Sequence, residues 1–238
     1  MTDEKKISVC LASYNGEKYI KEQLESILLQ LSENDEVIIS DDHSTDRTIE
    51  IIKSLKDTRI KIYENSNGKG PIKNFENAIC NASGDIIFLS DQDDIWKENK
   101  VRKIMSMFSS DETITLVSSN AEYIDQDGHP TGTNFFKGHV PERSLLHHYV
   151  KPEFLGCTIA FKNRIIDKLL PFPNKIPMHD WWIGMMHIYY GKVKYVPEAL
   201  ISYRRHDNNV TSRKKSKLSK IIRWRVDFLF NFVKTILK

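Results

Sequence analysis

IIFLSDQDDIW, residues 86–96, joins an apolar run to three aspartates that fall within four positions. The apolar residues before Ser90 are typical of a buried strand. Like charges a few ångströms apart repel, which costs free energy unless a cation or a solvated face relieves it. The stretch therefore predicts a strand that ends where Asp91, Asp93 and Asp94 meet something positive.

Upstream of this stretch the chain alternates strand and helix patterns. Apolar, β-branched runs predict strands at residues 6–13, 35–42, 60–65 and 85–91. Amphipathic segments between them, one opening with hydroxyl residues as helix caps, predict helices at residues 16–31, 44–57 and 71–83. Such alternation predicts an α/β fold with a Rossmann-like, mostly parallel central sheet flanked by helices on both faces.

Polar residues follow three of the predicted strands, in the segments SYNGE, SDDHSTD and SDQDD. Ligands of such sheets bind beyond the carboxyl ends of the strands. The sequence therefore predicts a carboxylate-lined cleft at this edge, formed by Tyr14, Asn15, Asp41, Asp42, Asp91 and Asp93. For any single aspartate a helix cap or a turn is the alternative, but three strand ends together favour the cleft.

The spacing of Asp91 and Asp93 favours a hard divalent cation. Side chains two positions apart on an extended segment face the same way, and Mg²⁺ or Mn²⁺ held by one or two carboxylates typically takes further ligands from substrate phosphates. An isolated Asp-x-Asp triplet is weak support, because it is common in loops. The chain has neither a GxGxxG nor a GxxxxGKS motif, which argues against dinucleotide redox and P-loop chemistry.

Length and composition describe an ordinary globular protein of 238 residues, large enough for one large domain or two small ones. Cys10, Cys80 and Cys157 are widely spaced, which suits a reducing compartment and argues against a thiolate metal site. The N-terminal segment has no signal-peptide pattern, so export is not expected. No apolar run approaches the roughly 18 residues of a membrane-spanning helix.

The charge is unevenly distributed. Residues 213–238 carry nine Lys or Arg and one Asp, a formal charge of +8, whereas residues 1–212 carry −5. Apolar residues recur at helical spacing in this tail, at Leu218, Ile222, Val226, Leu229, Val233 and Ile236. The pattern predicts a basic amphipathic C-terminal helix for an anionic membrane surface. The alternative is a helix that packs on the domain or on another subunit; no motif supports a nucleic-acid partner.

ISVCLASYNGEKYIKEQLESILLQ, VIISDDHSTDRTIEII and GDIIFLSDQDDIW together resemble the N-terminal half of the family 2 inverting glycosyltransferases, which have a GT-A fold. The resemblance covers roughly residues 6–210, and FLSDQDDIW with a later HDWW is similar to the rhamnosyltransferase-like bacterial branch. It implies a nucleoside-diphosphate sugar donor, such as a dTDP- or UDP-sugar, and Mn²⁺ or Mg²⁺ as cofactor.

The resemblance also implies roles for individual residues. Those at the donor would be Ala12, Ser13 and Tyr14 at the base, Asp42 at the N3 edge of a pyrimidine, Lys73 at the nucleotide, Asp91 near the ribose and metal, and Gly156 at the donor sugar. The metal ligands would be Asp93 and His206. The role of Asp94 stays open, and without the resemblance His206 would be assigned to a surface turn.

Asp180 in MHDWWIGMMHIYYG is the predicted catalytic base. Inverting displacement at an anomeric carbon needs a carboxylate that takes the proton of the attacking hydroxyl. In the family this carboxylate is the second member of an acidic pair; His179 replaces the first, and its role stays open. The alternative for Asp180 is a helix N-cap. Candidate acceptor or phosphate contacts are Trp181, Trp182, Arg204 and Arg205.

The sequence thus predicts a glycosyltransferase domain at residues 1–212, with a nucleotide-sugar half to about residue 95 and an acceptor half after it, followed by the helix at 213–238. The expected reaction is metal-dependent sugar transfer to a saccharide or lipid-linked saccharide in bacterial polysaccharide, O-antigen or capsule synthesis. The expected location is cytoplasmic, peripheral on the inner face of the cell membrane. A nucleotidyltransferase and a non-catalytic nucleotide-sugar-binding module are the alternatives.

Overall fold

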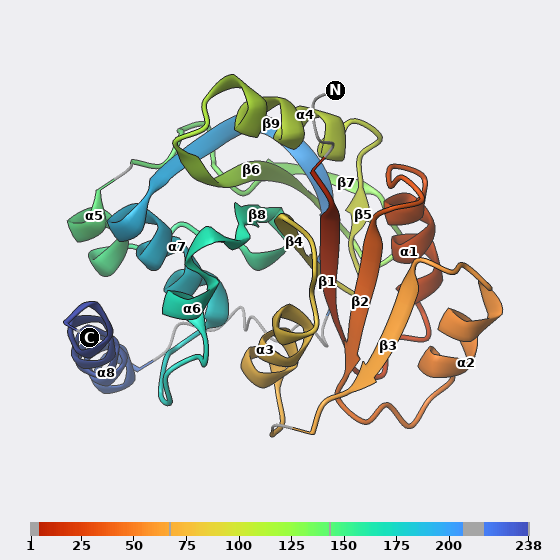
Figure 1. Cartoon of the computed structure of the whole chain (residues 1–238), viewed down its shortest axis with the longest axis horizontal. Coiled ribbons are helices and arrows are strands. Elements are labelled where there is room, and N and C mark those ends of the chain that lie inside the picture. The colour runs from red at the N-terminus through yellow and green to blue at the C-terminus, as the bar shows by residue number, and fades with distance from the viewer. Residues whose placement is uncertain (1–4, 67, 143, 207–216, 238) are drawn as a thin grey trace.

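The computed structural model describes residues 5–66, 68–142, 144–206 and 217–237 (Figure 1). One mixed sheet organises these residues, in the strand order β3-β2-β1-β4-β8-β6-β9-β5, with β7 paired to β6. The first four strands of this order are parallel, β8 is antiparallel to β4 and β6, and β9 runs parallel to β6. The predicted α/β fold with a mostly parallel sheet is confirmed.

The first half of the chain forms the parallel part of the sheet and its helices. These elements are β1 (Ile7–Ser13), α1 (Ile20–Leu28), β2 (Glu36–Asp41), α2 (Thr48–Ser54), β3 (Ile60–Glu64), α3 (Pro71–Cys80) and β4 (Ile86–Asp91). Each lies within its predicted segment, because the apolar periodicity that indicates an element also marks the face that it buries.

The second half adds the antiparallel strands and the helices beside them. These elements are β5 (Ile95–Trp96), α4 (Lys100–Ser110), β6 (Ile114–Ile124), β7 (Pro130–Asn134), α5 (Leu145–Val150), η1 (Gly156–Thr158), β8 (Ile159–Lys162), η2 (Asn163–Ile165), α6 (Ile166–Leu169), α7 (His179–Tyr190), β9 (Lys192–Arg204) and α8 (Leu218–Ile236). Asp127 and Gly128 lie in the turn that joins the antiparallel strands β6 and β7 into a hairpin.

Helices cover both faces of the sheet (Figure 1). One core contains apolar residues of α1, α2 and α4, and the other contains those of α3, α7 and α8. Along β1, Val9 and Leu11 join the first core and Cys10 joins the second. This alternation is what an extended strand buried on both faces requires.

The register of the sheet brings three strand ends to one level. Ala12 on β1 pairs with Asp91 on β4, and Ser13 pairs with Asp41 on β2. The residues after these strands therefore lie at the same edge of the sheet, where the sequence predicts the cleft.

The start of α2 differs from the expected hydroxyl caps. The carboxylate of Asp46 accepts hydrogen bonds from the Thr48 N–H at 3.0 Å and from the Thr48 hydroxyl. Ser44 is instead engaged by Asp41, to which its N–H and hydroxyl both donate. Asp46, which precedes the N-cap residue Arg47, therefore satisfies the first backbone N–H of α2, while Ser44 closes the loop after β2.

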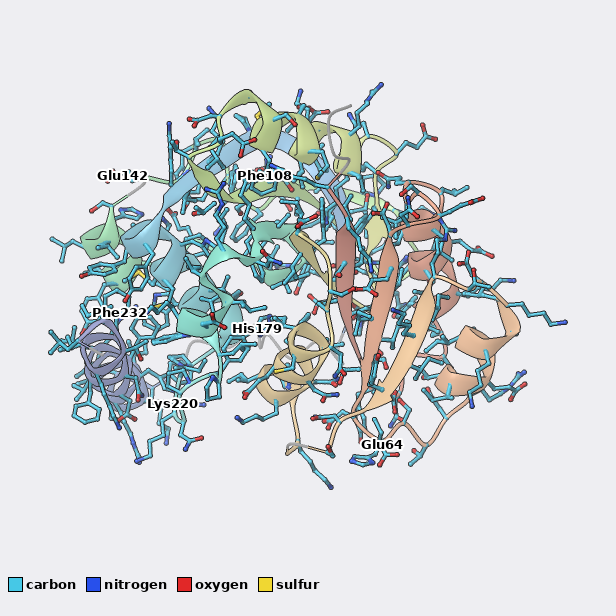
Figure 2. The ribbon with its side chains drawn as sticks, in the orientation of Figure 1. Glu64, Phe108, Glu142, His179, Lys220 and Phe232 are labelled. Carbon is cyan, nitrogen blue, oxygen red and sulfur yellow. The ribbon has the colours of Figure 1, made fainter. Side chains whose placement is uncertain are left out.

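The basic C-terminal helix is present as α8, although residues 213–216 of its predicted segment lie outside the described residues. Phe228 and Phe232 are its buried side chains, of which Figure 2 labels Phe232. Phe228 stacks on Trp181 of α7 with ring centroids 4.1 Å apart. Most of the predicted apolar stripe is exposed instead, at Leu218, Ile222, Val226, Leu229 and Val233. Among the described residues, no helix is long and apolar enough to cross a membrane.

Candidate active site

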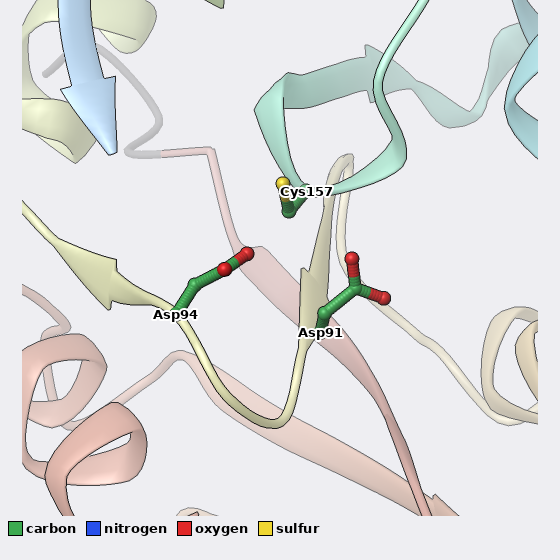
Figure 3. A group of neighbouring side chains, drawn as sticks. All are labelled: Asp91, Asp94 and Cys157. Atoms are coloured by element: carbon green, nitrogen blue, oxygen red, sulfur yellow. The ribbon is translucent and has the colours of Figure 1, made fainter. Parts of the chain in front are cut away.

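The aspartates of the opening stretch meet at the turn between β4 and β5. Asp91 ends β4, Asp94 precedes β5, and the Asp94 side chain points toward Cys157 of η1, with the Asp91 side chain nearby (Figure 3). One potential ligand atom from each of these three residues lies within 4.8 Å of the other two. Asp93 and Asp94 are buried, and Asp91 is half-buried. The sheet edge therefore carries a compact acidic cluster.

Arg204 at the end of β9 holds this turn in place. Its N–H donates to Asp94 Oδ1 at 3.0 Å, its Nε donates to the Asp93 carbonyl oxygen at 2.9 Å, and its guanidinium pairs with Glu22 at 2.6 Å. The side chain is buried. Arg204 was predicted to contact a phosphate. In the structure its N–H groups instead bond to other residues of the protein.

Gln92 supports the turn from the β1 side. Its side-chain amide accepts from the Tyr14 N–H at 2.8 Å and donates to the Tyr14 carbonyl oxygen at 2.9 Å. A Cβ on Gly16 would lie 2.2 Å from Gln92 Oε1, so the absent side chain makes room for this bridge. The loops after β1 and β4 are thereby joined as one unit.

Burial and mutual repulsion shift the ionisation of the cluster. Burial, with the charges of Asp93 and Asp180, raises the pKa of Asp91 to about 7. Burial and the charges of Asp93 and Asp91 raise the pKa of Asp94 well above its usual range. Apart from a weak interaction with the Cys157 thiol, Asp94 Oδ2 is buried without a hydrogen-bond partner among the described residues. Without a cation beside them, Asp91 and Asp94 therefore bind protons more readily than an exposed aspartate does.

Lys100 supplies positive charge to the cluster from inside the protein. Its fully buried Nζ donates to the Cys157 carbonyl oxygen at 2.8 Å and lies 3.9 Å from the centre of the Trp96 ring. Burial lowers the pKa of Lys100 to about 7, although Asp94 and Asp91 oppose this. Part of the positive charge that the sequence predicts beside the aspartates therefore comes from Lys100 itself.

The predicted metal ligands Asp93 and His206 lie together, with Asp93 Oδ2 2.7 Å from His206 Nε2. The His206 ring packs against Tyr19, with centroids 5.3 Å apart. Carboxylate oxygens with one imidazole suit Mn²⁺ or Mg²⁺. Cys157 is a poor ligand for such a cation, since burial and the charges of Asp94 and Asp91 raise the pKa of its thiol and keep it protonated. The residues present thus fit a hard divalent cation.

Asp180 lies at the start of α7 and faces the same space. Its Oδ1 accepts from the Trp181 N–H at 2.6 Å. Burial raises the pKa of Asp180 to about 6, and hydrogen bonds from the backbone of Trp181 and Gly156 oppose the rise. Its charge contributes to the raised pKa of Asp91, which places the two carboxylates near one another. Met178, not Asp180, is the N-cap of α7, so the N-cap alternative is wrong, and the raised pKa of Asp180 suits a general base.

Gly156 lies against the start of α7. A Cβ at this position would be 2.9 Å from His179 Nε2 and 3.8 Å from Asp180 Cβ. His179 is buried, stacks on Phe75 with centroids 4.1 Å apart, and has no hydrogen bond to either ring nitrogen among the described residues. Burial lowers its pKa to about 3. His179 is therefore a neutral packing residue, which answers the question that the sequence left open.

The predicted base-binding residues lie together at the ends of β1 and β2. The Ser13 hydroxyl donates to Asp41 at 2.8 Å, and the backbone N–H of Asp42 donates to the Ser13 carbonyl oxygen at 2.9 Å. Asp42 accepts from Asn65 at 2.9 Å and from the Gly70 N–H at 2.8 Å. Asp41 is buried and closes its own loop, which is the turn-forming role that the sequence gave as the alternative.

The remaining donor-side residues differ in exposure. Tyr14 is 55% exposed and Ala12 is half-buried beside it. Lys73 on α3 donates to Glu76 at 2.7 Å, so its ammonium group is already paired. Tyr14 is therefore the most accessible of the predicted nucleotide contacts.

The predicted acceptor contacts do not lie together. Trp182 is fully buried and donates to the Leu169 carbonyl oxygen at 3.2 Å, and Trp181 is buried against Phe228. Both tryptophans are core residues, because α7 packs between the sheet and α8. Arg205 is exposed, with its guanidinium 3.9 Å from the centre of the Tyr123 ring. Of these contacts, Arg205 alone presents an exposed side chain.

The family model described as Glycosyl transferase family 2 matches residues 8–170. The chain belongs to this family. It is a glycosyltransferase, and the match spans β1, the acidic cluster and η1. The predicted resemblance is confirmed, and the alternatives of a nucleotidyltransferase and a non-catalytic binding module are set aside.

Curated relatives of the glycosyltransferase come from several bacteria. An uncharacterized glycosyltransferase of Haemophilus influenzae is 29% identical over 87% of this chain and 67% of its own length. The Escherichia coli UDP-Glc:alpha-D-GlcNAc-diphosphoundecaprenol beta-1,3-glucosyltransferase WfgD is 27% identical over 97% of this chain and 88% of its own length. The Shigella flexneri dTDP-rhamnosyl transferase RfbG is 29% identical over 84% and 72%.

Solved structures confirm the GT-A fold. Staphylococcus aureus TarS 1-349, in complex with UDP-GlcNAc, has a TM-score of 0.73 at 22% identity over 95% of this chain and 67% of its own. The mannosyltransferase PcManGT of Pyrobaculum calidifontis, in complex with GDP-Man and Mn²⁺, has a TM-score of 0.64 at 20% identity. The match covers 100% of this chain and 66% of PcManGT. The glycosyltransferase thus spans about two thirds of several of the proteins that it resembles.

Sequence reasoning missed Lys100 and the structural roles of Gln92 and Arg204. Lys100 belongs to the polar segment KENK, which is typical of an exposed helix start. Its burial depends on Trp96 and on Cys157, which is 57 residues away. No local signal in the sequence indicates such contacts. The structural role of Gln92, in contrast, could have been suspected, since this residue lies between the aspartates of the motif.

Proposed function

We propose that the glycosyltransferase moves a sugar, with inversion, from a nucleoside-diphosphate sugar to a saccharide or lipid-linked saccharide in bacterial polysaccharide, O-antigen or capsule synthesis. The observation that carries this proposal is the position of Asp180, which lies beside Gly156, next in sequence to Cys157 of the acidic cluster. A base and a carboxylate-lined diphosphate site are the two parts that inverting transfer needs. RfbG supports rhamnose as one candidate sugar, because it is named a dTDP-rhamnosyl transferase.

The donor would lie along the carboxyl edge of the sheet. Ala12, Ser13, Tyr14, Asp42 and Lys73 would contact its nucleotide, and Gly156 would adjoin its sugar. Asp93 and His206, with Asp91 nearby, would hold Mn²⁺ or Mg²⁺, which when bound neutralises charge on the departing diphosphate. The names of TarS with UDP-GlcNAc and PcManGT with GDP-Man and Mn²⁺ support a nucleotide-sugar donor and a metal.

Asp180 would act as the general base. It accepts the proton of the acceptor hydroxyl while that oxygen bonds to the anomeric carbon and the bond from this carbon to the diphosphate breaks. The base is active when deprotonated, and a pKa of about 6 leaves most of it in that form near pH 7. The partly desolvated position of Asp180 strengthens its basicity relative to an exposed aspartate.

The nucleotide-sugar half would end near residue 95 and the acceptor half would follow it to residue 212. The exposed apolar stripe of α8 would lie on the inner face of the cell membrane, with its lysines and arginines near anionic headgroups. The glycosyltransferase would then be a peripheral membrane protein on the cytoplasmic side. The lipid-linked acceptor in the name of WfgD supports this placement.

The donor is tested with a panel of dTDP-, UDP- and GDP-sugars in Mn²⁺ or Mg²⁺. We expect one donor class to raise the melting temperature and to undergo slow hydrolysis. Asp93→Ala should abolish the metal-dependent part of both signals. The matched control is Asp167→Ala, at an exposed position of α6. No response to any of these donors would contradict the proposal.

The membrane contact is tested by sedimentation with vesicles that contain phosphatidylglycerol. Ile222→Glu with Val226→Glu changes two side chains that are 55% and 60% exposed, and should release the protein. Leu29→Glu, at an 86% exposed position of the loop after α1, is the control. Deleting α8 is a poorer test, because it would uncover Trp181. If the wild-type protein, the double variant and the Leu29→Glu control sediment equally with vesicles, anchoring through this stripe is excluded.

A further inference from the structure

Two cavities adjoin at Tyr123, on the acceptor side of the molecule. The first has a volume of about 330 Å³ and is lined by Tyr123, Asp125, Thr131, Thr133 and Arg205. The second has a volume of about 190 Å³ and contains Tyr123 at one end, together with residues that follow β7 and α5. Both include Tyr123 in their lining, so the two cavities are neighbours, and we refer to them together as the groove.

The first cavity lies next to the acidic cluster. The ring of Tyr123 packs edge-on against Tyr203, with centroids 5.8 Å apart. Burial and the charge of Asp91 raise the pKa of Tyr203, so this ring is close to the carboxylates. Arg205 directly precedes His206. A molecule in this cavity is therefore adjacent to the site where the donor would react.

The side chains of the first cavity suit a sugar. The exposed Arg205 lies over the buried ring of Tyr123, and the hydroxyls of Thr131 and Thr133 face one another at 2.9 Å. Asp125 adds a carboxylate. These polar groups can form hydrogen bonds with the hydroxyls of a sugar, and about 330 Å³ lies within the usual range of small-molecule sites, roughly 300–1,000 Å³.

The second cavity is richer in cations. Lys137, His139 and Lys151 line it, with Glu153 as its carboxylate. Lys151 forms an ion pair with Glu153 at 2.6 Å, and the rings of His139 at 2.9 Å and His147 at 2.8 Å also contact this carboxylate. Lys137 has no acidic partner within 4.0 Å among the described residues. The ammonium groups of Lys137 and Lys151 provide hydrogen-bond donors and charge for an anion.

The second cavity ends beside α5, which contacts α8. Lys151 follows α5 directly, and α5 is joined to α8 where the Tyr149 hydroxyl donates to the Arg225 carbonyl oxygen at 3.2 Å and Arg225 Nη2 donates to the Val150 carbonyl oxygen at 2.7 Å. Leu146 and Val150 of α5 are exposed, as is the apolar stripe of α8. Glu142, just before α5, lies on the same flank of the molecule as Phe232 (Figure 2).

We propose that this groove binds an acceptor sugar carried on a lipid diphosphate. The sugar occupies the cavity of Tyr123 and Arg205, the diphosphate lies between Lys137 and Lys151, and the lipid leaves along the exposed apolar residues of α5 toward α8. The order of surfaces along the groove, first polar and hydroxyl-bearing, then cationic, then apolar, matches the order of parts in such an acceptor. This inference rests on the proposed function.

Binding of n-decyl diphosphate tests the anionic part. Binding is measured by calorimetry. The donor site is first saturated with Mn²⁺ and a nucleotide, chosen from UDP, dTDP and GDP as the one that stabilises the protein. We expect Lys137→Ala with Lys151→Ala to raise the Kd at least tenfold, and Lys53→Ala, at an exposed position of α2, to leave it unchanged. Inorganic diphosphate should bind more weakly, because it lacks the alkyl chain.

Three results would overturn the diphosphate placement: no binding of n-decyl diphosphate by the wild-type protein, equal binding by the double variant, or equal affinity for inorganic diphosphate. Failure of the proposed function is a separate result, since none of the nucleotides would then bind. In that case n-decyl diphosphate is titrated without nucleotide, and the same comparison of variants applies.

The sugar part is tested with decyl diphosphate that carries N-acetylglucosamine. We expect the sugar to increase affinity in the wild-type protein, and Arg205→Ala with Thr133→Val to remove that increase while affinity for n-decyl diphosphate stays the same. If the sugar adds nothing, or if the variant keeps the increase, the cavity of Tyr123 and Arg205 is not the sugar site.

Discussion

The acidic cluster and the basic helix α8 are both strongly charged, but the protein holds them in opposite ways. Asp94 is buried, and the turn that carries it is held by Arg204, by Gln92 and by the nearby Lys100. The charges of α8 lie mostly in solvent, and the helix is attached mainly through Phe228 and Phe232. Burial shifts the pKa values of the cluster and fixes its shape. The exposed side of α8, in contrast, is a surface without a specific pocket.

The comparison implies that changes in the cluster act on chemistry, and changes in α8 act on attachment. Asp180→Asn should have the largest effect, because it keeps the size of the side chain and removes the base. We expect transfer to fall by about 10² to 10⁴-fold, the usual contribution of a general base. Donor binding, measured by thermal shift, should stay intact. Near-normal transfer by this variant would rule out Asp180 as the base.

The attachment of α8 is tested with two phenylalanines of the same helix. Phe228 is fully buried and Phe230 is 67% exposed. Phe228→Ala should lower the free energy of unfolding by about 3 kcal/mol, since a buried aromatic side chain is lost. Phe230→Ala should change it by less than about 0.5 kcal/mol. Urea denaturation measures both; equal losses would mean that α8 is not attached through Phe228.

Gly156→Ala tests whether catalysis depends on the exact positions of the side chains around the acidic cluster. The added Cβ would lie 2.9 Å from His179 Nε2, so the start of α7 must shift by a few tenths of an ångström. We expect kcat to fall roughly tenfold, because small displacements of a reacting group slow catalysis. A double-mutant cycle with His179→Ala should show coupling between the two positions. Additive effects would mean that Gly156 acts by another route.

The pH dependence is the finest test. The pKa of Asp180 is raised to about 6, and its deprotonated form is the base. Transfer should therefore be close to its maximum above pH 7 and should fall through pH 6, to roughly a tenth at pH 5. This limb should be absent from the residual activity of Asp180→Asn. A wild-type profile that is flat between pH 5 and 8 would contradict this assignment.

Part of the fold and site was predictable because its signals are local. Apolar runs that end in SYNGE, SDDHSTD and SDQDD mark both the strands and their carboxyl ends, and the parallel register brings Ala12 level with Asp91. Asp93 and His206, in contrast, are 113 residues apart and were paired by resemblance to a family. The structure brings them to 2.7 Å, in agreement with that expectation.

Other features were not predictable because they depend on what covers each side chain. Arg204 and Arg205 are adjacent and chemically alike, but one is buried against Glu22 and the other is exposed over Tyr123. Adjacent residues of an extended strand face opposite sides, and no local pattern states which side is covered. The same reasoning applies to α8, where the regular apolar stripe is exposed and Phe228 is the anchor.

The sequence by itself determined the order of strands and helices, the aspartates at the sheet edge and the charge of the C-terminal helix, because these follow from residue type and short spacing. Only the tertiary structure decided which charges are buried. Lys100 lies 57 residues from Cys157 and Arg204 lies 110 residues from Asp94. Ionisation depends on burial and on neighbours at this distance along the chain, and both arise only when the sheet is assembled.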